Sequence, residues 1–183
     1  MIHPLIGHIK RSWWRRSAPM RSDYVPGGGV IDAQVTKRGP GRVVRERMKY
    51  WLIKSEPAAF SWDMQCHNNV EPWTGVRNFQ ARNNLAAMEK GDRAFFYHSV
   101  TEKAIRGIVE IVRTAYPDPT SDDPKWVCVD VRTVKPMARP VTLAQIKATP
   151  ALSEMALLRQ SRLSVASITA EEWGVICKMG GIT

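Results

Sequence analysis

The segment Trp73-Thr74-Gly75-Val76-Arg77-Asn78 combines residue types that suit a flat or anionic ligand. Trp73 stands outside any periodic apolar run, so its indole is a candidate stacking face. Asn78 is a favourable N-cap for the helix that follows, and Arg77 then lies beside the positive end of that helix, against its local preference. An arginine beside free helix amides would suit a phosphate. The alternatives are purely structural roles: an arginine paired with a structural carboxylate, and a tryptophan anchored in the core.

A second group of candidates ends a predicted strand at Phe95-Phe96-Tyr97-His98-Ser99. Side chains alternate along a strand, so Phe96 and His98 face one side and the other three residues face the opposite side. The two phenylalanines are expected in the core. Tyr97, His98 and Ser99 are candidates for the mouth of a pocket, although ordinary sheet residues would give the same pattern.

Motifs for catalysis are missing. The sequence has no glycine-rich phosphate loop, no H-E-x-x-H and no G-x-S-x-G. Cys66 and His67 are adjacent, and neighbouring residues rarely point at each other, so a helix-end cysteine with a solvated histidine is the simpler interpretation. Three cysteines far apart predict neither a disulfide framework nor a zinc site. We therefore expect no catalytic residue, metal or cofactor, and a reducing intracellular compartment.

The surrounding pattern predicts a mixed α+β domain with a small, partly closed β-barrel, because strands and helices do not alternate regularly. Capping boxes at Thr142-x-x-Gln145 and Thr169-x-x-Glu172 predict two helix starts. Proline at position 150 suits the first turn of another helix. Strands are expected at 50–53, 94–98, 105–114, 126–134 and 162–165, and further helices at 61–66 and 78–88.

The basic excess belongs mainly to the N-terminal segment. Residues 1–47 hold 10 Lys and Arg against 3 Asp and Glu, whereas residues 48–183 hold 17 against 14. The segment is rich in glycine and proline and keeps no apolar period, so we expect a disordered extension there and one domain over 48–183. Three interpretations compete: an organelle transit peptide, a basic arm that attracts phosphates, or an upstream extension of the reading frame before Met48.

Five motifs, in order along the body, resemble the EVE domain family over about residues 48–177. They are Tyr50-Trp51-Leu52-Ile53-Lys54-Ser55-Glu56-Pro57, Trp73-Thr74-Gly75-Val76-Arg77-Asn78-Phe79-Gln80-Ala81-Arg82-Asn83, Phe96-Tyr97-His98-Ser99, Ala115-Tyr116-Pro117-Asp118-Pro119 and Arg162-Leu163-Ser164-Val165.

This resemblance implies a PUA-like barrel of about five to six strands flanked by helices. It also implies a non-catalytic module that reads a modified base in DNA or RNA, such as methylated or hydroxymethylated cytosine. A monomer without membrane association is expected. By motif, the implied pocket has Ser55 and Glu56 at the first strand end, Trp73 as stacking wall, Val76, Arg77 and Asn78 as the next wall, Tyr97, His98 and Ser99 as floor, and Arg162 and Ser164 as far rim.

The chain departs from the family pattern at Thr74, where an acidic residue is common, at Phe79, where tyrosine is common, and at Ala166-Ser167. The preferred base is therefore open. Phosphate contacts are expected from Arg77, Arg82, Arg159 and Arg162, which would give affinity without sequence choice. Two other functions stay open: an RNA-processing or base-modification enzyme, and a protein-interaction module without a pocket ligand.

Overall fold

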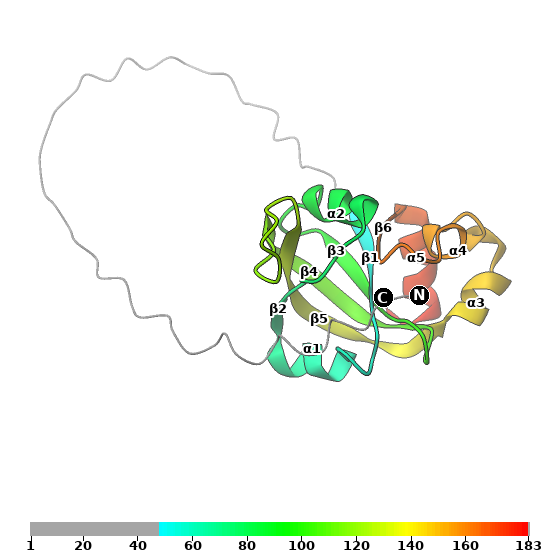
Figure 1. Ribbon diagram of the computed structural model, residues 1–183. Helices are drawn as coiled ribbons and strands as arrows, with labels where there is room; N and C mark the ends of the chain where they lie inside the picture. The colour runs from blue at the N-terminus through cyan, green and yellow to red at the C-terminus, as the bar shows by residue number, and fades with distance from the viewer. Residues whose placement is uncertain (1–47, 183) are drawn as a thin grey trace, which may run out of the picture. The chain divides into compact units, whose positions relative to one another are not determined.

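The computed structural model describes residues 48–182, which form one mixed sheet of six strands with helices packed on both faces (Figure 1). The extension predicted over 1–47 lies outside the described residues. None of the helices within 48–182 has the length and hydrophobicity needed to span a bilayer. In chain order the elements are β1 (Tyr50–Ser55), α1 (Trp62–Asn68), β2 (Val70–Pro72), α2 (Phe79–Ala86), β3 (Arg93–His98), β4 (Ala104–Pro117), β5 (Val127–Thr142), α3 (Leu143–Ala148), the 3-10 helix η1 (Pro150–Leu152), α4 (Ala156–Arg159), β6 (Val165–Ile168) and α5 (Ala170–Met179).

The strand order is β2-β5-β4-β3-β1-β6, with β1 parallel to β3 and the other neighbours antiparallel. The predicted mixed α+β class is confirmed. Register shifts interrupt the β3–β4 and β4–β5 pairings, and such irregularities bend strands. The edge strands β2 and β6 are not hydrogen-bonded to each other in the described sheet, so the predicted partial closure into a barrel is not seen.

Alternating apolar side chains give this sheet two buried faces. From β1, Trp51 and Ile53 join a core that includes Ala81 and Leu85 of α2, which we call the α2 face. Leu52, between them, joins a second core that includes Trp173 of α5, which we call the α5 face. In Figure 1, α3, α4 and α5 gather at the right of the sheet, while α2 lies above the sheet and α1 below it. Consecutive residues of one strand therefore serve different cores.

Three predicted helix starts are confirmed by their caps. The Asn78 side-chain oxygen accepts a hydrogen bond from the Ala81 amide at 2.9 Å, and both capping boxes are formed, at Thr142 and Thr169. Other bounds differ from the prediction: the strand expected over 126–134 runs on to Thr142 as β5, and the helix expected over 78–88 ends at Ala86. β2 has only three residues, one of them proline, and carries no alternation to detect; β6 begins at Val165 rather than at Arg162.

Candidate nucleic-acid interface

An open hollow of about 330 Å³ lies at the start of α2. Asn78 and Gln80 come from the first turn of that helix, and the opposite wall comes from the end of α4 and the segment that leads into β6. A hydrogen bond at 2.7 Å from the Asn84 amide to the Val165 carbonyl ties α2 to β6 and holds the two walls together. We call it the amide hollow; its lining residues are Asn78, Gln80, Arg159, Gln160, Ser161, Arg162 and Leu163.

The lining of the amide hollow offers donors, acceptors and positive charge. Because the Asn78 oxygen caps α2, its amide nitrogen is left as a donor. Gln80 and Gln160 each present both a donor and an acceptor. Arg162 is exposed and lies at the rim, whereas Arg159 pairs with Glu154 at 2.7 Å. Such a site can bond the edge of a base and a nearby phosphate.

Arg77 is tied to a structural carboxylate, the alternative that its position had left open. Its guanidinium lies 2.7 Å from the Asp118 carboxylate, whose side chain is fully buried. Asp118 also accepts hydrogen bonds from the Gly75 amide at 2.8 Å and from the amide and hydroxyl of Thr120. Gly75 has φ +80°, a conformation that favours glycine. This network fixes the loop that leads into Asn78.

An aromatic pair, the exposed Phe79 and the half-buried Trp126, lies next to these residues and was not predicted. Phe79 is 58% exposed, and its ring centroid lies 5.1 Å from that of Trp126. Arginine and lysine side chains lie over both rings: Arg82 is 5.3 Å from the Phe79 centroid, and Arg77 and Lys125 are within 6 Å of Trp126. We call Phe79, Trp126, Arg77, Arg82 and Lys125 the aromatic cluster. Accessible aromatic rings among cations are a usual platform for unpaired bases.

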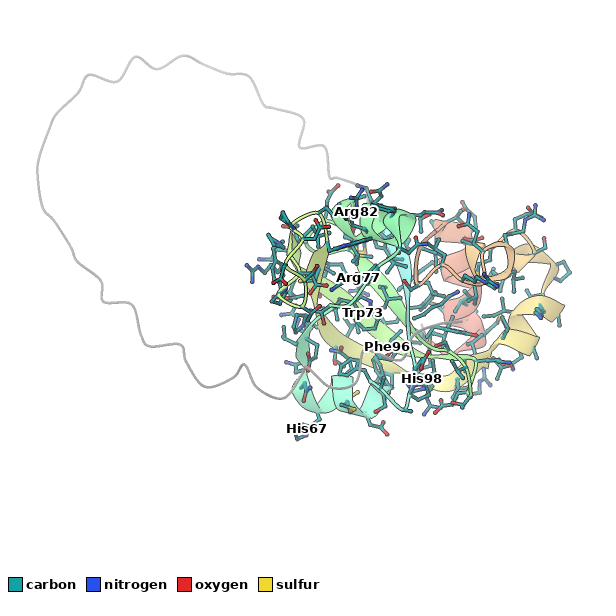
Figure 2. All side chains as sticks on the ribbon, viewed as in Figure 1. His67, Trp73, Arg77, Arg82, Phe96 and His98 are labelled. Carbon is teal, nitrogen blue, oxygen red and sulfur yellow. The ribbon has the colours of Figure 1, made fainter. Side chains whose placement is uncertain are left out.

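Trp73 is a core residue rather than an open stacking wall. Its side chain is 6% exposed, and its ring meets Phe60 and Phe96 edge-on, at centroid distances of 6.2 and 5.5 Å. Figure 2 shows Trp73 beside Phe96 in the interior, with Arg82 and His67 at the surface. Trp73 lines neither the amide hollow nor a second hollow beside Lys54 and Tyr97. The expectation that its indole borders an open cavity therefore has to be revised.

Several other predicted site residues are held by structural bonds. The Ser55 hydroxyl donates to the Phe60 carbonyl at 2.6 Å. His98 accepts a hydrogen bond from the Trp62 amide at 2.9 Å, and its other ring nitrogen lies 2.7 Å from Glu102, where this bond holds the pKa of the Glu102 carboxyl below its usual value. These groups organise the turn between β1 and α1 and the end of β3.

The predicted floor is divided between the two faces of the sheet. His98 contacts Phe96 on the α2 face, whereas Tyr97 belongs to the core of the α5 face and lines a different hollow together with Ser99. The strand alternation is thus confirmed, and a shared floor of these three residues is wrong. Of the remaining candidates, Val76 is buried in the α2 face, Glu56 is half-buried with its carbonyl accepting from two amides, and the Ser164 carbonyl accepts from the Lys54 amide.

The cysteines show no sign of activation. Burial and the nearby Asp63 carboxylate raise the pKa of the Cys66 thiol, and burial raises the pKa of Cys128 to about 11. A nucleophilic cysteine needs the opposite shift. Within residues 48–182, no group of three or more His, Cys, Asp or Glu side chains is placed to hold a metal ion.

Residues 49–179 match the EVE domain. The chain belongs to the EVE domain family. Its relatives include thymocyte nuclear protein 1 of Homo sapiens, 38% identical over 164 residues, covering 71% of this chain and 73% of the relative.

Solved EVE domain structures share the fold. A protein of Rhodopseudomonas palustris determined by NMR is 56% identical and superposes with a TM-score of 0.70, covering 73% of this chain and 94% of the other. Human THYN1 protein, solved in complex with 5-methylcytosine containing DNA, is 35% identical with a TM-score of 0.69, covering 74% of this chain and 99% of the other.

Proposed function

We propose that this EVE domain binds nucleic acid that carries a modified base and acts without catalysis. The observation that carries the proposal is its likeness to human THYN1 protein, whose structure holds 5-methylcytosine containing DNA. The preferred ligand is methylated or hydroxymethylated cytosine in DNA, and a methylated base in RNA is the alternative. The proposal also includes a PUA-like curved sheet and a location inside the cell. It further includes a monomeric state, because both walls of the amide hollow come from one chain.

The amide hollow provides the base site in this proposal. Cytosine presents a donor at its exocyclic nitrogen and acceptors beside it, which side-chain amides of Asn78, Gln80 and Gln160 can complement. Leu163 is the apolar member of the lining and is available to a methyl group. One buried methyl contributes about 0.8 kcal/mol. That free energy alone gives a preference of only about fourfold, and a closely fitted hydrophobic pocket reaches about 10- to 200-fold.

The aromatic cluster provides stacking that Trp73, in its core position, does not offer. A base next to the modified one can stack on Phe79 or Trp126, and each stacked base contributes about 1–3 kcal/mol. That gain is comparable to the cost of a few kcal/mol for unstacking a base from a duplex. Single-stranded or already distorted nucleic acid should therefore bind better than an intact duplex.

A direct test is fluorescence anisotropy with labelled 12-nucleotide oligomers that differ in one central residue. Cytosine, 5-methylcytosine and 5-hydroxymethylcytosine are compared in single-stranded DNA, in duplex DNA and in RNA. We expect the modified strand to bind more tightly than its unmodified partner. A Gln160→Ala variant should weaken both strands alike, because cytosine and 5-methylcytosine share the edge that this side-chain amide would bond. Equal affinity for all three residues in every strand type would refute the reader function.

Arg162 is expected to contribute a phosphate contact rather than base choice. Replacing Arg162 with alanine should weaken modified and unmodified strands equally and reduce the slope of log affinity against log salt by about 0.7–0.9, the value for one phosphate. Titrations between low and moderate salt measure this slope. The matched control is Arg139→Ala, an exposed arginine that lines neither hollow, which should leave the slope unchanged.

A further inference from the structure

A second hollow, of about 190 Å³, opens at the ends of β1 and β3 on the α5 face of the sheet. It is distinct from the amide hollow, although Ser161 lines both. Its volume lies below the range of about 300–1,000 Å³ for drug-sized ligands, so its occupant must be small. We call it the lysine hollow; its lining residues are Lys54, Tyr97, Ser99, Val100, Lys103, Leu143, Leu157 and Ser161.

Positive charge in the lysine hollow is unbalanced. Lys54 and Lys103 line it, and no carboxylate is among its lining residues in the described domain. The Lys54 ammonium donates to the Ser161 carbonyl at 2.9 Å but forms no ion pair within residues 48–182. Burial lowers the pKa of Lys54 to about 8. A half-buried ammonium without a counter-charge favours the arrival of an anion.

An unused hydrogen-bond donor lies in the same wall. Tyr97 is 3% exposed and lines the hollow, and its hydroxyl forms no hydrogen bond to another residue of the described domain. The buried side-chain polar atoms without a partner in residues 48–182 are Gln65 Oε1 and Arg93 Nε, so the Tyr97 hydroxyl is instead open to the hollow and can donate to a ligand there. Burial raises the pKa of Tyr97, so the hydroxyl stays protonated and able to donate at neutral pH.

The loop that completes the lysine hollow holds two unusual backbone conformations. Val100 has φ +62° and Lys103 has φ +48°, and both line the hollow. A β-branched residue at positive φ is rare in proteins. Such conformations persist where the surroundings hold them, and they cluster at sites that clamp ligands. Val100 is also 57% exposed, and with Leu143 and Leu157 it gives the hollow an apolar side.

We propose that the lysine hollow binds a small phosphate monoester, with its oxygens on Lys54, Lys103 and Tyr97 and its short apolar group against Val100, Leu143 and Leu157. A monoester carries about −1.5 to −2 charges at pH 7, which matches two ammonium groups. The Ser99 hydroxyl donates to the Ser55 carbonyl at 3.2 Å and borders the site without opposing charge. The monoester is either a free small molecule or the terminal phosphate of a nucleic-acid strand, since the two hollows meet at Ser161.

Binding of the monoester should depend on pH in a defined direction. Lys54 binds the anion only when it is protonated, so affinity should fall as pH rises through about 8, and binding at pH 8 should take up protons. The other ionisable groups in the lining are Tyr97, which remains neutral, and Lys103, which is exposed. Calorimetry in two buffers of different ionisation enthalpy measures the uptake.

The test uses the full chain with phenyl phosphate and inorganic phosphate as probes. Binding is measured by changes in amide chemical shifts and by calorimetry. Wild type should bind phenyl phosphate with shifts at the lysine hollow. Tyr97→Phe removes only the unpaired hydroxyl and should fold normally, yet it should weaken binding about tenfold or more. Lys54→Met should weaken it at least as much, and Lys147→Met, a surface control outside both hollows, should not.

Two comparisons separate the sources and the two proposals. The strand terminus is the source if a 5′-phosphorylated oligomer binds more tightly than its 5′-hydroxyl partner and Tyr97→Phe removes the difference. A free monoester is the source if phenyl phosphate binds but the two oligomers do not differ. The choice between modified and unmodified cytosine should be unchanged in Tyr97→Phe. The phosphate-binding proposal is overturned if wild type binds neither phosphate probe, or if Tyr97→Phe and Lys54→Met both keep full affinity. The proposed reading of modified bases would be unaffected by that result.

Discussion

Replacing Trp73 with alanine is expected to lower the free energy of unfolding by about 3–5 kcal/mol, the usual cost of emptying a large aromatic site in a core. The ring is 6% exposed and packs against Phe60 and Phe96, which are themselves fully buried. Their packing on the α2 face depends on the indole volume. Urea unfolding followed by circular dichroism measures the change in the midpoint and slope.

Phe79→Ala is the matched control for this substitution. Phe79 is 58% exposed, so its removal should change stability by less than about 0.5 kcal/mol. It should instead weaken the binding of single-stranded nucleic acid by about 1–3 kcal/mol, because a base that stacks on Phe79 loses its platform. The opposite result, a stable Trp73→Ala protein that no longer binds while Phe79→Ala binds normally, would restore Trp73 as the stacking wall.

Removing the Asp118 carboxylate is also expected to be costly. Asp118→Ala should destabilise the domain by about 1–3 kcal/mol, because the change removes the buried acceptor of several hydrogen bonds, whereas the Arg77 side chain is 37% exposed and stays solvated. The partners are the Arg77 guanidinium, the Gly75 amide and two donors of Thr120. Nucleic-acid affinity should fall as well, since this network positions the loop before Asn78. Thermal and urea unfolding at pH 7 give the stability change, and Asp122→Ala, an exposed neighbour, should differ from wild type by less than about 0.5 kcal/mol.

The same carboxylate predicts how stability depends on pH. Burial alone would raise the pKa of Asp118, but the bonds from Arg77, Thr120 and Gly75 hold it below its ordinary value of 3.8. A group whose pKa is depressed by folding stabilises the protein above its unfolded pKa and loses that contribution as pH falls through the folded one. Wild type should therefore lose stability below about pH 4 more steeply than Asp118→Ala. Parallel acid titrations of the two proteins would contradict this assignment.

Local patterns predicted elements well where apolar spacing or a cap was strong. The caps at Asn78, Thr142 and Thr169 and the alternation over 95–99 appear in the structure as the sequence indicates. Carrying a pocket floor over from the family placed Tyr97, His98 and Ser99 together, against that same alternation. The local rule was the better guide, because adjacent strand residues cannot share one face.

Features that depend on residues far apart in the sequence could not be predicted from local residue spacing. A tryptophan in a loop has no period, so the burial of Trp73 depends on distant Phe60 and Phe96. The amide hollow joins residues of α2 to the segment after α4, which no local pattern brings together. Phe79 did carry a signal: it lies off the apolar stripe of Ala81 and Leu85 on the same helix, so its exposure could have been predicted.

The division of β1 and β3 between two faces has a consequence for how this domain can evolve. Lys54 borders the lysine hollow, while its neighbour Ser55 bonds inward beside Phe60. Deleting or inserting a single codon before either position would send each side chain to the opposite face. A substitution at Lys54 can therefore change the lysine hollow while leaving the inward bond of Ser55 intact, but a change of length near these strand ends would disrupt both together.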